Sequence, residues 1–269
     1  MIDIHTHLHP PRLFAAIRRW FAANSSWDIA AQPQEPREVA AVLRSAGVER
    51  FVFCSYAHRP GMARELNAWL VQTARALGGY GVPLATIHPD DPTALEDLRA
   101  ALEEGCAGLK LHEDVQQVAC DDPRLDPVYA ELAARNRFLL VHVGPIPWKY
   151  EKREGLARVE HVLTRHPDLN VVVAHFGVPD TLDYFELMSK HNGLNLDTTM
   201  VFAPSSPMYT NTNAVDAIER HPDRVLYGTD FPNIPHDYQA ELRGLESLGL
   251  RASTLRAVLH DNAERLLYG

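Results

Sequence analysis

The sequence predicts a single (β/α)8 barrel domain that spans residues 1–269. Short runs rich in β-branched and aromatic residues recur eight times, and stretches with helical spacing of apolar residues lie between them. Most of these runs are continuously apolar, which is typical of parallel strands buried on both faces. Eight strand–helix units of this kind are enough to close a barrel.

The eight predicted strands are distributed along the whole chain. They are Ile2–His7, Phe51–Tyr56, Val82–Ile87, Ala107–His112, Phe138–Val143, Val171–Phe176, Leu194–Thr199 and Val225–Phe231.

The stretches between the strands predict amphipathic helices. Among them are Arg37–Ala46, Met62–Leu77, Thr93–Glu104, Asp180–His191 and Ala214–Arg220, and Ser253–Leu267 is expected to close the fold. Prolines precede or open several of these helices and glycines follow them, as at Pro36 and Gly47. A doubly wound open sheet is the alternative, because alternation alone does not show closure, but no glycine-rich dinucleotide loop follows the first strand.

Composition excludes several functional classes. A net charge of -9 and scattered basic residues disfavour nucleic acid as a partner. The three cysteines, Cys54, Cys106 and Cys120, have neither disulfide-framework nor zinc-knuckle spacing, which favours a reducing compartment. No apolar run approaches membrane-spanning length, and the chain starts directly with a strand. We expect a soluble cytoplasmic protein without a membrane partner.

Ionisable side chains gather at the carboxyl ends of the predicted strands. His5 and His7 leave the same face of the first strand because they are two residues apart. The other candidates at strand ends are Lys110 and His112 on strand four, His142 on strand five, His175 on strand six and Asp230 on strand eight. In a barrel these ends converge at one mouth, where barrel enzymes place their chemistry.

A single such histidine would most simply be a strand-end residue hydrogen-bonded to a loop. Seven ionisable groups buried at one mouth would be costly unless they were paired or bound to a cation. The pattern therefore predicts a metal site, with zinc as the default ion and manganese, iron or cobalt also suited to mixed imidazole and carboxylate ligands.

Lys110 leaves two chemical alternatives open. A protonated lysine beside a dication must pair with an acid such as Asp230 or lose its proton. A neutral lysine can take up carbon dioxide, and the resulting carbamate can bridge two metal ions. The expected number of metal ions is therefore one or two.

The order of these motifs resembles that of the amidohydrolase superfamily over nearly the whole chain. The sequence is most similar to the amidohydrolase-related branch that includes aminocarboxymuconate-semialdehyde decarboxylase. This resemblance rests on three segments: Asp3-Ile-His-Thr-His7, Val173-Ala-His-Phe-Gly177 and Tyr227-Gly-Thr-Asp-Phe-Pro232. It implies a (β/α)8 barrel with metal ligands at His5, His7, His142, His175 and Asp230.

A second, shorter resemblance concerns Gly108-Leu-Lys-Leu-His-Glu-Asp114, which is similar to the urease segment whose lysine is carbamylated. It implies that Lys110 bridges two metals and that His112 polarises a substrate carbonyl. The decarboxylase branch typically uses one metal and lacks this lysine, so the two resemblances imply different metal counts.

The leading functional hypothesis is hydrolysis of a small amide, lactone or ester by metal-activated water. Asp230 would accept and return the proton, and His175 or His112 would stabilise the oxyanion. Non-oxidative decarboxylation of an aromatic or unsaturated acid is the enzymatic alternative, with Arg59 or the Trp148–Lys149 loop as carboxylate clamp. A barrel that binds metal or ligand without turnover is the third hypothesis, and it requires no proton shuttle.

Substrate identity depends on two loops, Ile146–Glu154 and Phe202–Asn213, whose conformations the sequence does not define. Their aromatic residues Trp148, Tyr150, Phe202 and Tyr209 suggest an apolar or planar small-molecule substrate. Outside these loops, His58 and His236 are plausible substrate contacts. Oligomeric state stays undetermined, because no helix shows a conspicuous second apolar face.

Overall fold

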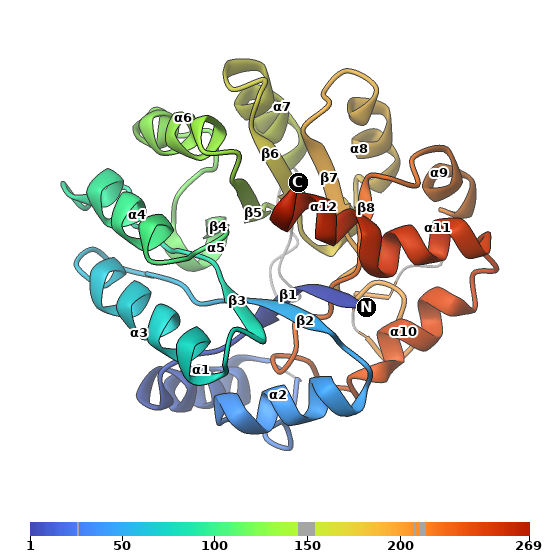
Figure 1. The fold of residues 1–269 in the computed structure, drawn as a ribbon, viewed down its shortest axis with the longest axis horizontal. Helices are drawn as coiled ribbons and strands as arrows, with labels where there is room; N and C mark the ends of the chain where they lie inside the picture. Colours follow the sequence, from blue (N-terminus) through green and yellow to red (C-terminus); the bar gives the residue numbers. More distant parts are fainter. Residues whose placement is uncertain (26, 145–153, 207, 210–213) are drawn as a thin grey trace.

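The computed structural model describes residues 1–25, 27–144, 154–206, 208–209 and 214–269. Eight parallel strands surround the axis of the molecule and helices surround the strands (Figure 1). The strands are β1 (Ile2–His7), β2 (Arg50–Cys54), β3 (Gly81–Pro83), β4 (Gly108–His112), β5 (Phe138–His142), β6 (Asn170–Val173), β7 (Leu194–Asp197) and β8 (Val225–Leu226).

Regular pairing divides the strands into two sheets, β1-β2-β3 and β4-β5-β6-β7-β8. Backbone hydrogen bonds cross both seams between them. At one seam Ala85 N donates to Gly108 O (2.8 Å) and Lys110 N donates to Ala85 O (2.9 Å). At the other, Ile4 N donates to Tyr227 O (2.8 Å) and Asp230 N donates to His5 O (2.8 Å). The predicted (β/α)8 barrel is confirmed.

Four of the longer helices lie in ranges predicted from apolar periodicity: α2 (Pro36–Ser45), α3 (Ala63–Ala76), α4 (Ala94–Glu103) and α8 (Thr181–Met188). The other longer helices are α1 (Pro11–Asn24), α6 (Asp126–Ala134), α7 (Gly155–Arg165) and α10 (Gln239–Glu246). Shorter ones are α5 (Glu113–Gln116), α9 (Val215–Arg220), α11 (Ala252–Arg256) and α12 (Asn262–Tyr268), with 3-10 turns at Pro123–Leu125 and His175–Gly177. The predicted closing helix is interrupted, because a π-helical segment, Ala257–Asp261, lies between α11 and α12.

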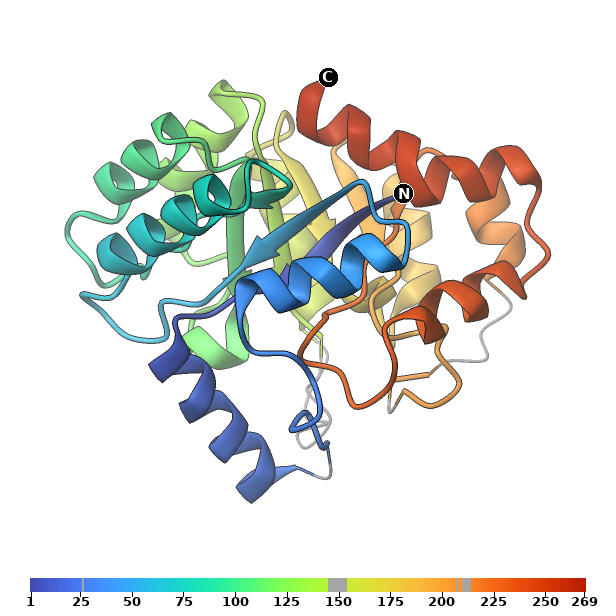
Figure 2. The same cartoon turned by 60° about the horizontal axis from the view of Figure 1, so that its bottom comes forward.

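Helix α1 is not among the predicted helices. It begins at Pro11, whose ring lacks a backbone N–H and suits the first turn of a helix. Figure 2 shows α1 extending beyond the end of β1, at the end of the barrel opposite to α12.

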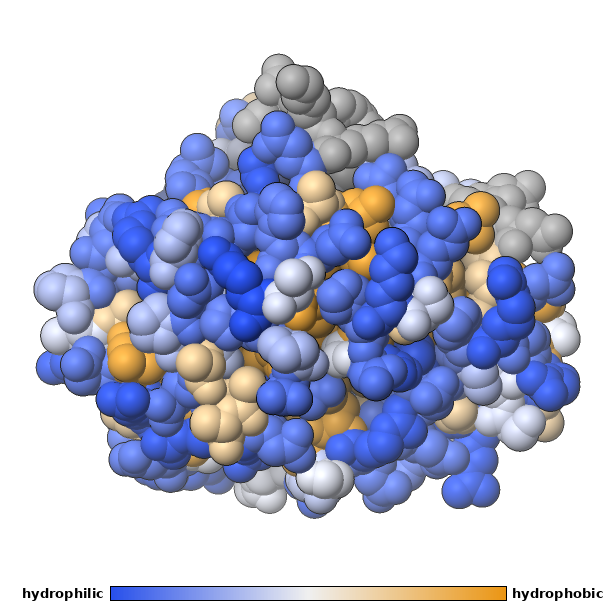
Figure 3. Space-filling model, turned by 90° about the horizontal axis from the view of Figure 1, so that it is seen from above, coloured by the Kyte–Doolittle hydropathy of each residue, from blue (hydrophilic) through white to orange (hydrophobic). Residues whose placement is uncertain are grey.

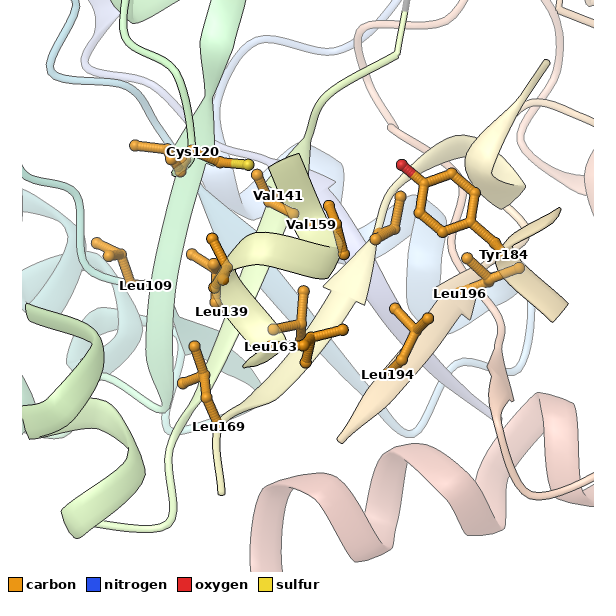
Figure 4. Close-up of a cluster of buried hydrophobic side chains, with 14 of the residues drawn as sticks. Leu109, Cys120, Leu139, Val141, Val159, Leu163, Leu169, Tyr184, Leu194 and Leu196 are labelled. Carbon is orange, nitrogen blue, oxygen red and sulfur yellow. The ribbon is translucent and has the colours of Figure 1, made fainter. Parts of the chain in front are cut away.

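The core has two layers because successive strand residues point to opposite faces. Inside the barrel, Ile4, Leu140 and Val172 pack together, and Leu267 of α12 closes this layer at the amino ends of the strands. The outer layer packs the alternate strand residues against the surrounding helices. Figure 4 shows its members Leu109, Leu139, Val141, Val159, Leu163, Leu194 and Leu196.

Most predicted strands end earlier than the sequence suggests, and two of these early ends place site residues beyond their strands. Strand β6 ends at Val173 and β8 at Leu226, so His175 and Asp230 follow their strands and are not part of them. Both residues have left-handed backbones, with φ of 55° for His175 and 69° for Asp230. L-residues rarely adopt this conformation, and it is held at positions where the surrounding structure requires a particular side-chain direction.

Within the described residues, no helix is long and apolar enough to cross a bilayer. The face seen in Figure 3 is mostly hydrophilic, and its hydrophobic residues form small separate groups.

Candidate metal centre

The seven predicted site residues lie together at the carboxyl ends of the strands. Their centre is formed by His5, His7 and Asp230. The Asp230 Oδ1 atom lies 2.7 Å from His7 Nε2 and 3.2 Å from His5 Nε2. The two imidazole rings are 5.2 Å apart between centroids. Segments more than 220 residues apart in sequence therefore present three potential ligand atoms to one point.

Lys110 lies at this same point and is fully buried. Its Nζ atom is 3.0 Å from His5 Nε2. Among the described ion pairs there is none between Lys110 and Asp230, although the charge of Asp230 acts on the lysine. Burial lowers the pKa of Lys110, although the charges of Cys54, Asp197 and Asp230 oppose this shift.

His112, His142 and His175 extend the cluster outward. The His112 and His142 rings stack with centroids 4.0 Å apart, and the His142 and His175 rings meet edge to face at 4.6 Å. His175 in turn lies 5.7 Å from His5. These contacts connect all four histidine-bearing segments of the mouth in one continuous group.

The charges of this cluster are unevenly distributed. Burial lowers the pKa of His5 to about 4, and the nearby Lys110 adds to the effect. Burial also lowers the pKa of His7, but Cys54 and Asp230 outweigh it and raise the value to about 10. Burial raises the pKa of Asp230, yet the histidines around it, His7 first, hold it far below its usual range. His7 and Asp230 thus form a charged pair beside a neutral His5.

The outer histidines favour their neutral forms. Burial is the largest cause that lowers the pKa of each of His112, His142 and His175. A neutral imidazole has a lone pair available for a metal, so this environment suits the role of ligand.

Three residues at the site were not among the predicted ones. Asp197, at the end of β7, is fully buried and contacts His5 through its carboxylate. Cys54 Sγ lies 3.3 Å from His7 Nδ1, and one ligand atom from each of His5, His7 and Cys54 lies within 4.8 Å of the others. Tyr56 OH lies 3.1 Å from His7 Nε2. All three follow apolar strand segments, the same signal that identified the predicted residues.

A cavity of about 460 Å³ opens onto this cluster. The cluster contributes His112, His142, His175 and Asp230 to its wall. The rest of the wall is largely apolar and comes mainly from α1 and the strand-end loops: Leu13, Ala16, Ile17, Trp20, Phe21, Trp27, Tyr56, His58, Asp114, Val115, Met208 and Asn233.

Several weaker sequence candidates have different positions. His58 lines the cavity as expected, whereas His236 is buried outside its wall. Phe202 is a core residue, and Tyr209 is exposed and does not line the cavity. The suggestion that these two aromatic residues contact a substrate was therefore wrong. Trp148 and Tyr150 lie outside the described residues, as does most of the 146–154 loop.

Solved structures with the same fold cover almost the whole chain. An uncharacterized TIM-barrel protein from Bordetella bronchiseptica is 22% identical, with a TM-score of 0.77 and coverage of 99% of this chain and 98% of the other. The 5-carboxyvanillate decarboxylase of Sphingomonas paucimobilis is 17% identical, with a TM-score of 0.73 and the same coverage. A putative 2-pyrone-4,6-dicarboxylic acid hydrolase from Pseudomonas putida is 18% identical, with a TM-score of 0.71 and coverage of 99% and 96%.

A curated relative, the dihydroorotase of Pseudoalteromonas atlantica, is 29% identical over 133 residues. That alignment covers 45% of this chain and 38% of the relative, so it spans little more than a third of the relative's length. The amidohydrolase family model, in contrast, matches residues 2–268. With its barrel, its strand-end histidines and this match over nearly its full length, the chain belongs to the amidohydrolase family.

Proposed function

We propose that this protein is a metal-dependent hydrolase of a small, neutral, largely apolar carbonyl compound: an amide, a lactone or an ester. The observation that carries the proposal is the position of Asp230. Its Oδ1 atom lies within 3.2 Å of both strand-one histidines, and Asp230 also lines the cavity. An acid that contacts both the predicted metal ligands and the substrate space can accept the proton of an attacking water and pass it on.

The donor atoms present fit a divalent cation. His5, His7, His142, His175 and Asp230 supply imidazole and carboxylate ligands, which suit zinc first and also manganese, iron or cobalt. A cation held there lowers the pKa of water and polarises a substrate carbonyl. A cation bound there would take the place of the proton that His7 shares with Asp230, because a ligating histidine must be neutral.

The remaining steps belong to residues of the chain. Asp230 accepts a proton from water at Oδ1 and delivers it to the leaving group. His112 lines the cavity, and its Nδ1 accepts from Val115 N, so its Nε2–H can donate a hydrogen bond toward the oxygen on which negative charge develops. The apolar wall from α1 excludes water and orients the substrate body.

Lys110 determines the number of metal ions in this proposal. Its burial and lowered pKa favour a neutral amine, which adds carbon dioxide through a new N–C bond and loses a proton to give an anionic carbamate. We therefore propose that carbamylated Lys110 would serve as an additional anionic ligand, which would allow the centre to hold two ions.

Decarboxylation is the second candidate, because a decarboxylase shares this fold with a TM-score of 0.73. An aromatic acid would need a cation for its carboxylate. Within the described part of the cavity wall there is neither an arginine nor a lysine, and Arg59 does not line it. The Trp148–Lys149 segment lies outside the described residues. The described wall therefore supplies no cationic side chain for a carboxylate in addition to the proposed metal centre.

The test is a screen of the metal-loaded protein against lactones, amides and esters and against aromatic carboxylic acids. Hydrolysis consumes water and releases an acid with no carbon dioxide, whereas decarboxylation releases carbon dioxide. Turnover of a neutral carbonyl compound supports the proposal, and turnover confined to carboxylic acids with release of carbon dioxide contradicts it.

The first mutational prediction concerns Asp230→Asn. The amide cannot accept the water's proton, so kcat should fall by about 10²- to 10⁴-fold while much of the metal stays bound to the histidines. Turnover and metal content are measured on the same preparation. Unchanged turnover would refute the role of Asp230, whereas a wild type that binds metal but turns over none of the screened compounds would fit a barrel that merely binds metal.

A further inference from the structure

Asp197 at the end of β7 contacts two segments of the metal centre at once. Its Oδ2 atom accepts a hydrogen bond from His5 Nδ1 at 2.8 Å. Its Oδ1 atom accepts from the backbone N–H groups of His175 (2.9 Å) and Thr199 (3.1 Å). The side chain is fully buried, and it does not line the cavity. Asp197 is therefore placed to act on the site through His5 and His175 and has no contact with a substrate.

These contacts define which nitrogen of His5 carries the proton. An ionised carboxylate only accepts hydrogen bonds, so the ring nitrogen facing Asp197 must be a donor. On the opposite side of the ring, Lys110 Nζ lies 3.0 Å from Nε2, and a lysine side chain donates to such a lone pair. Both neighbours favour a neutral ring with its hydrogen on Nδ1 and its lone pair on Nε2.

We propose that Asp197 is a positioning residue that holds His5 in the Nδ1–H tautomer and thereby keeps Nε2 free to ligate a divalent cation. This inference rests on the metal centre proposed above. Histidines that bind metals commonly donate their other ring N–H to a carboxylate or carbonyl, and loss of that partner costs about 10- to 100-fold in metal affinity.

Two other groups near the His5 ring bear on the proposal. Asp230 Oδ1 is 3.2 Å from Nε2 and favours the opposite tautomer. Thr199 Oγ1 is 3.2 Å from Nδ1, and a hydroxyl accepts or donates equally well. The Asp197 contact is shorter than either, and Asp230 Oδ1 already contacts His7 Nε2 at 2.7 Å, so Asp197 determines the tautomer.

The isosteric substitution Asp197→Asn separates this role from simple packing. The amide oxygen stays with the two backbone N–H groups, because only an acceptor satisfies them. The amide nitrogen then faces His5 Nδ1, and two N–H donors cannot occupy that contact. We expect the ring to move its proton to Nε2, which removes the lone pair that the cation needs.

Two measurements test this proposal. One reports the tautomer of His5 in metal-free protein, and the other reports the affinity for zinc. ¹⁵N NMR of the histidine side chains, assigned with a His5→Gln variant, should show Nδ1–H for His5 in the wild type and Nε2–H in Asp197→Asn. Calorimetric titration of zinc into metal-free protein should show affinity weakened by about 10- to 100-fold in Asp197→Asn.

Two variants serve as controls. Asp122→Asn makes the same chemical change at a partly exposed carboxylate that accepts from Arg124 N, and zinc affinity should not change. Thr199→Val removes the longer hydroxyl contact and should keep the Nδ1–H tautomer, because Asp197 remains.

The outcomes distinguish this inference from the proposed function. Nε2–H in wild-type, metal-free protein would overturn the role of Asp197 whether or not the variant folds, and so would wild-type zinc affinity in Asp197→Asn. Nδ1–H in the wild type with no zinc binding at all would instead refute the metal centre itself.

Discussion

The charge of Lys110 is the feature of the site that depends most on its surroundings. The lysine is fully buried, next to a histidine whose pKa is lowered and a carboxylate that already pairs with His7. A permanent ammonium there would add positive charge where a dication is expected. A carbamate would instead add an anionic ligand without changing the backbone.

Replacement of Lys110 should therefore change metal stoichiometry. In Lys110→Met, we expect elemental analysis to find about one fewer metal ion per chain than in wild type purified with bicarbonate, because the bridging ligand is lost. Lys190→Met, at an exposed lysine 3.8 Å from Glu160, is the matched control and should bind metal as wild type does. Equal stoichiometry in wild type and Lys110→Met would contradict carbamylation.

At this scale the sequence identified most of the cluster, because an ionisable residue after an apolar strand is conspicuous. His5, His7, Lys110 and Asp230 all have this pattern, and the structure brings them together. Asp197 has the same pattern but was missed, since an acid at a strand end gives no sign of the ring it will contact 192 residues away.

At the scale of elements, helix α10 braces the loop that follows β7. The Glu241 carboxylate accepts hydrogen bonds from Phe202 N and Ala203 N, both at 3.0 Å. Gly244, one turn further, lies so close to Phe202 O that an added Cβ would be 1.9 Å from it. This close packing fixes the start of the loop that supplies Met208 to the cavity wall.

Because Glu241 is buried, its contribution to the stability of the fold depends on pH. Burial raises its pKa from 4.5 to about 8, against the opposing hydrogen bonds from Phe202 and Ala203. A raised carboxyl pKa means that the folded state retains a proton that the unfolded state releases. Its contribution to stability is full below about pH 4.5 and is lost as pH rises to about 8.

The corresponding prediction compares wild type with Glu241→Gln by urea unfolding at pH 5 and pH 8, both in chelator. The wild type should lose a few kcal/mol more of its free energy of unfolding over this interval than the variant does. Other titrating groups affect both proteins alike, so the difference isolates Glu241. Parallel pH profiles would show that Glu241 does not titrate in this range.

Element positions were largely predictable, but their ends near the site were not. Helices such as α3 and α4 begin and end within one residue of the predicted bounds, because proline, glycine and periodicity mark them locally. Strands β6 and β8 end early, since the left-handed backbones of His175 and Asp230 are set by contacts across the barrel and have no local sequence signal.

At the scale of the whole molecule, a metal centre should stabilise the closed barrel. Its ligands come from β1, β5 and the segments after β6 and β8, so an ion there would link both sheets and one of their seams. A ligand that binds only the folded state adds about 2.7 kcal/mol at a concentration 100 times its Kd.

We therefore expect a chelator to lower Tm by several degrees and zinc to restore it. His7→Ala should lose most of this zinc response, whereas His191→Ala, at a partly exposed histidine outside the cluster, should keep it. A wild-type Tm that is the same with chelator and with zinc would argue against a structural link through metal.

The sequence did not show whether the sheet closes into a barrel. Alternating strands and helices fit an open sheet equally well, and the hydrogen bonds that close the two seams join residues far apart in sequence, as between Ile4 and Tyr227. The apolar cavity wall from α1 was also missed, because its Pro10-Pro11 start resembles a loop as much as a helix.

The most direct test of the central claim is an anomalous diffraction measurement on crystals of zinc-loaded protein. The account predicts a zinc peak about 2.0–2.2 Å from Nε2 of His5, Nε2 of His7 and the carboxylate of Asp230. A fully loaded crystal with no zinc peak among these three residues would contradict it.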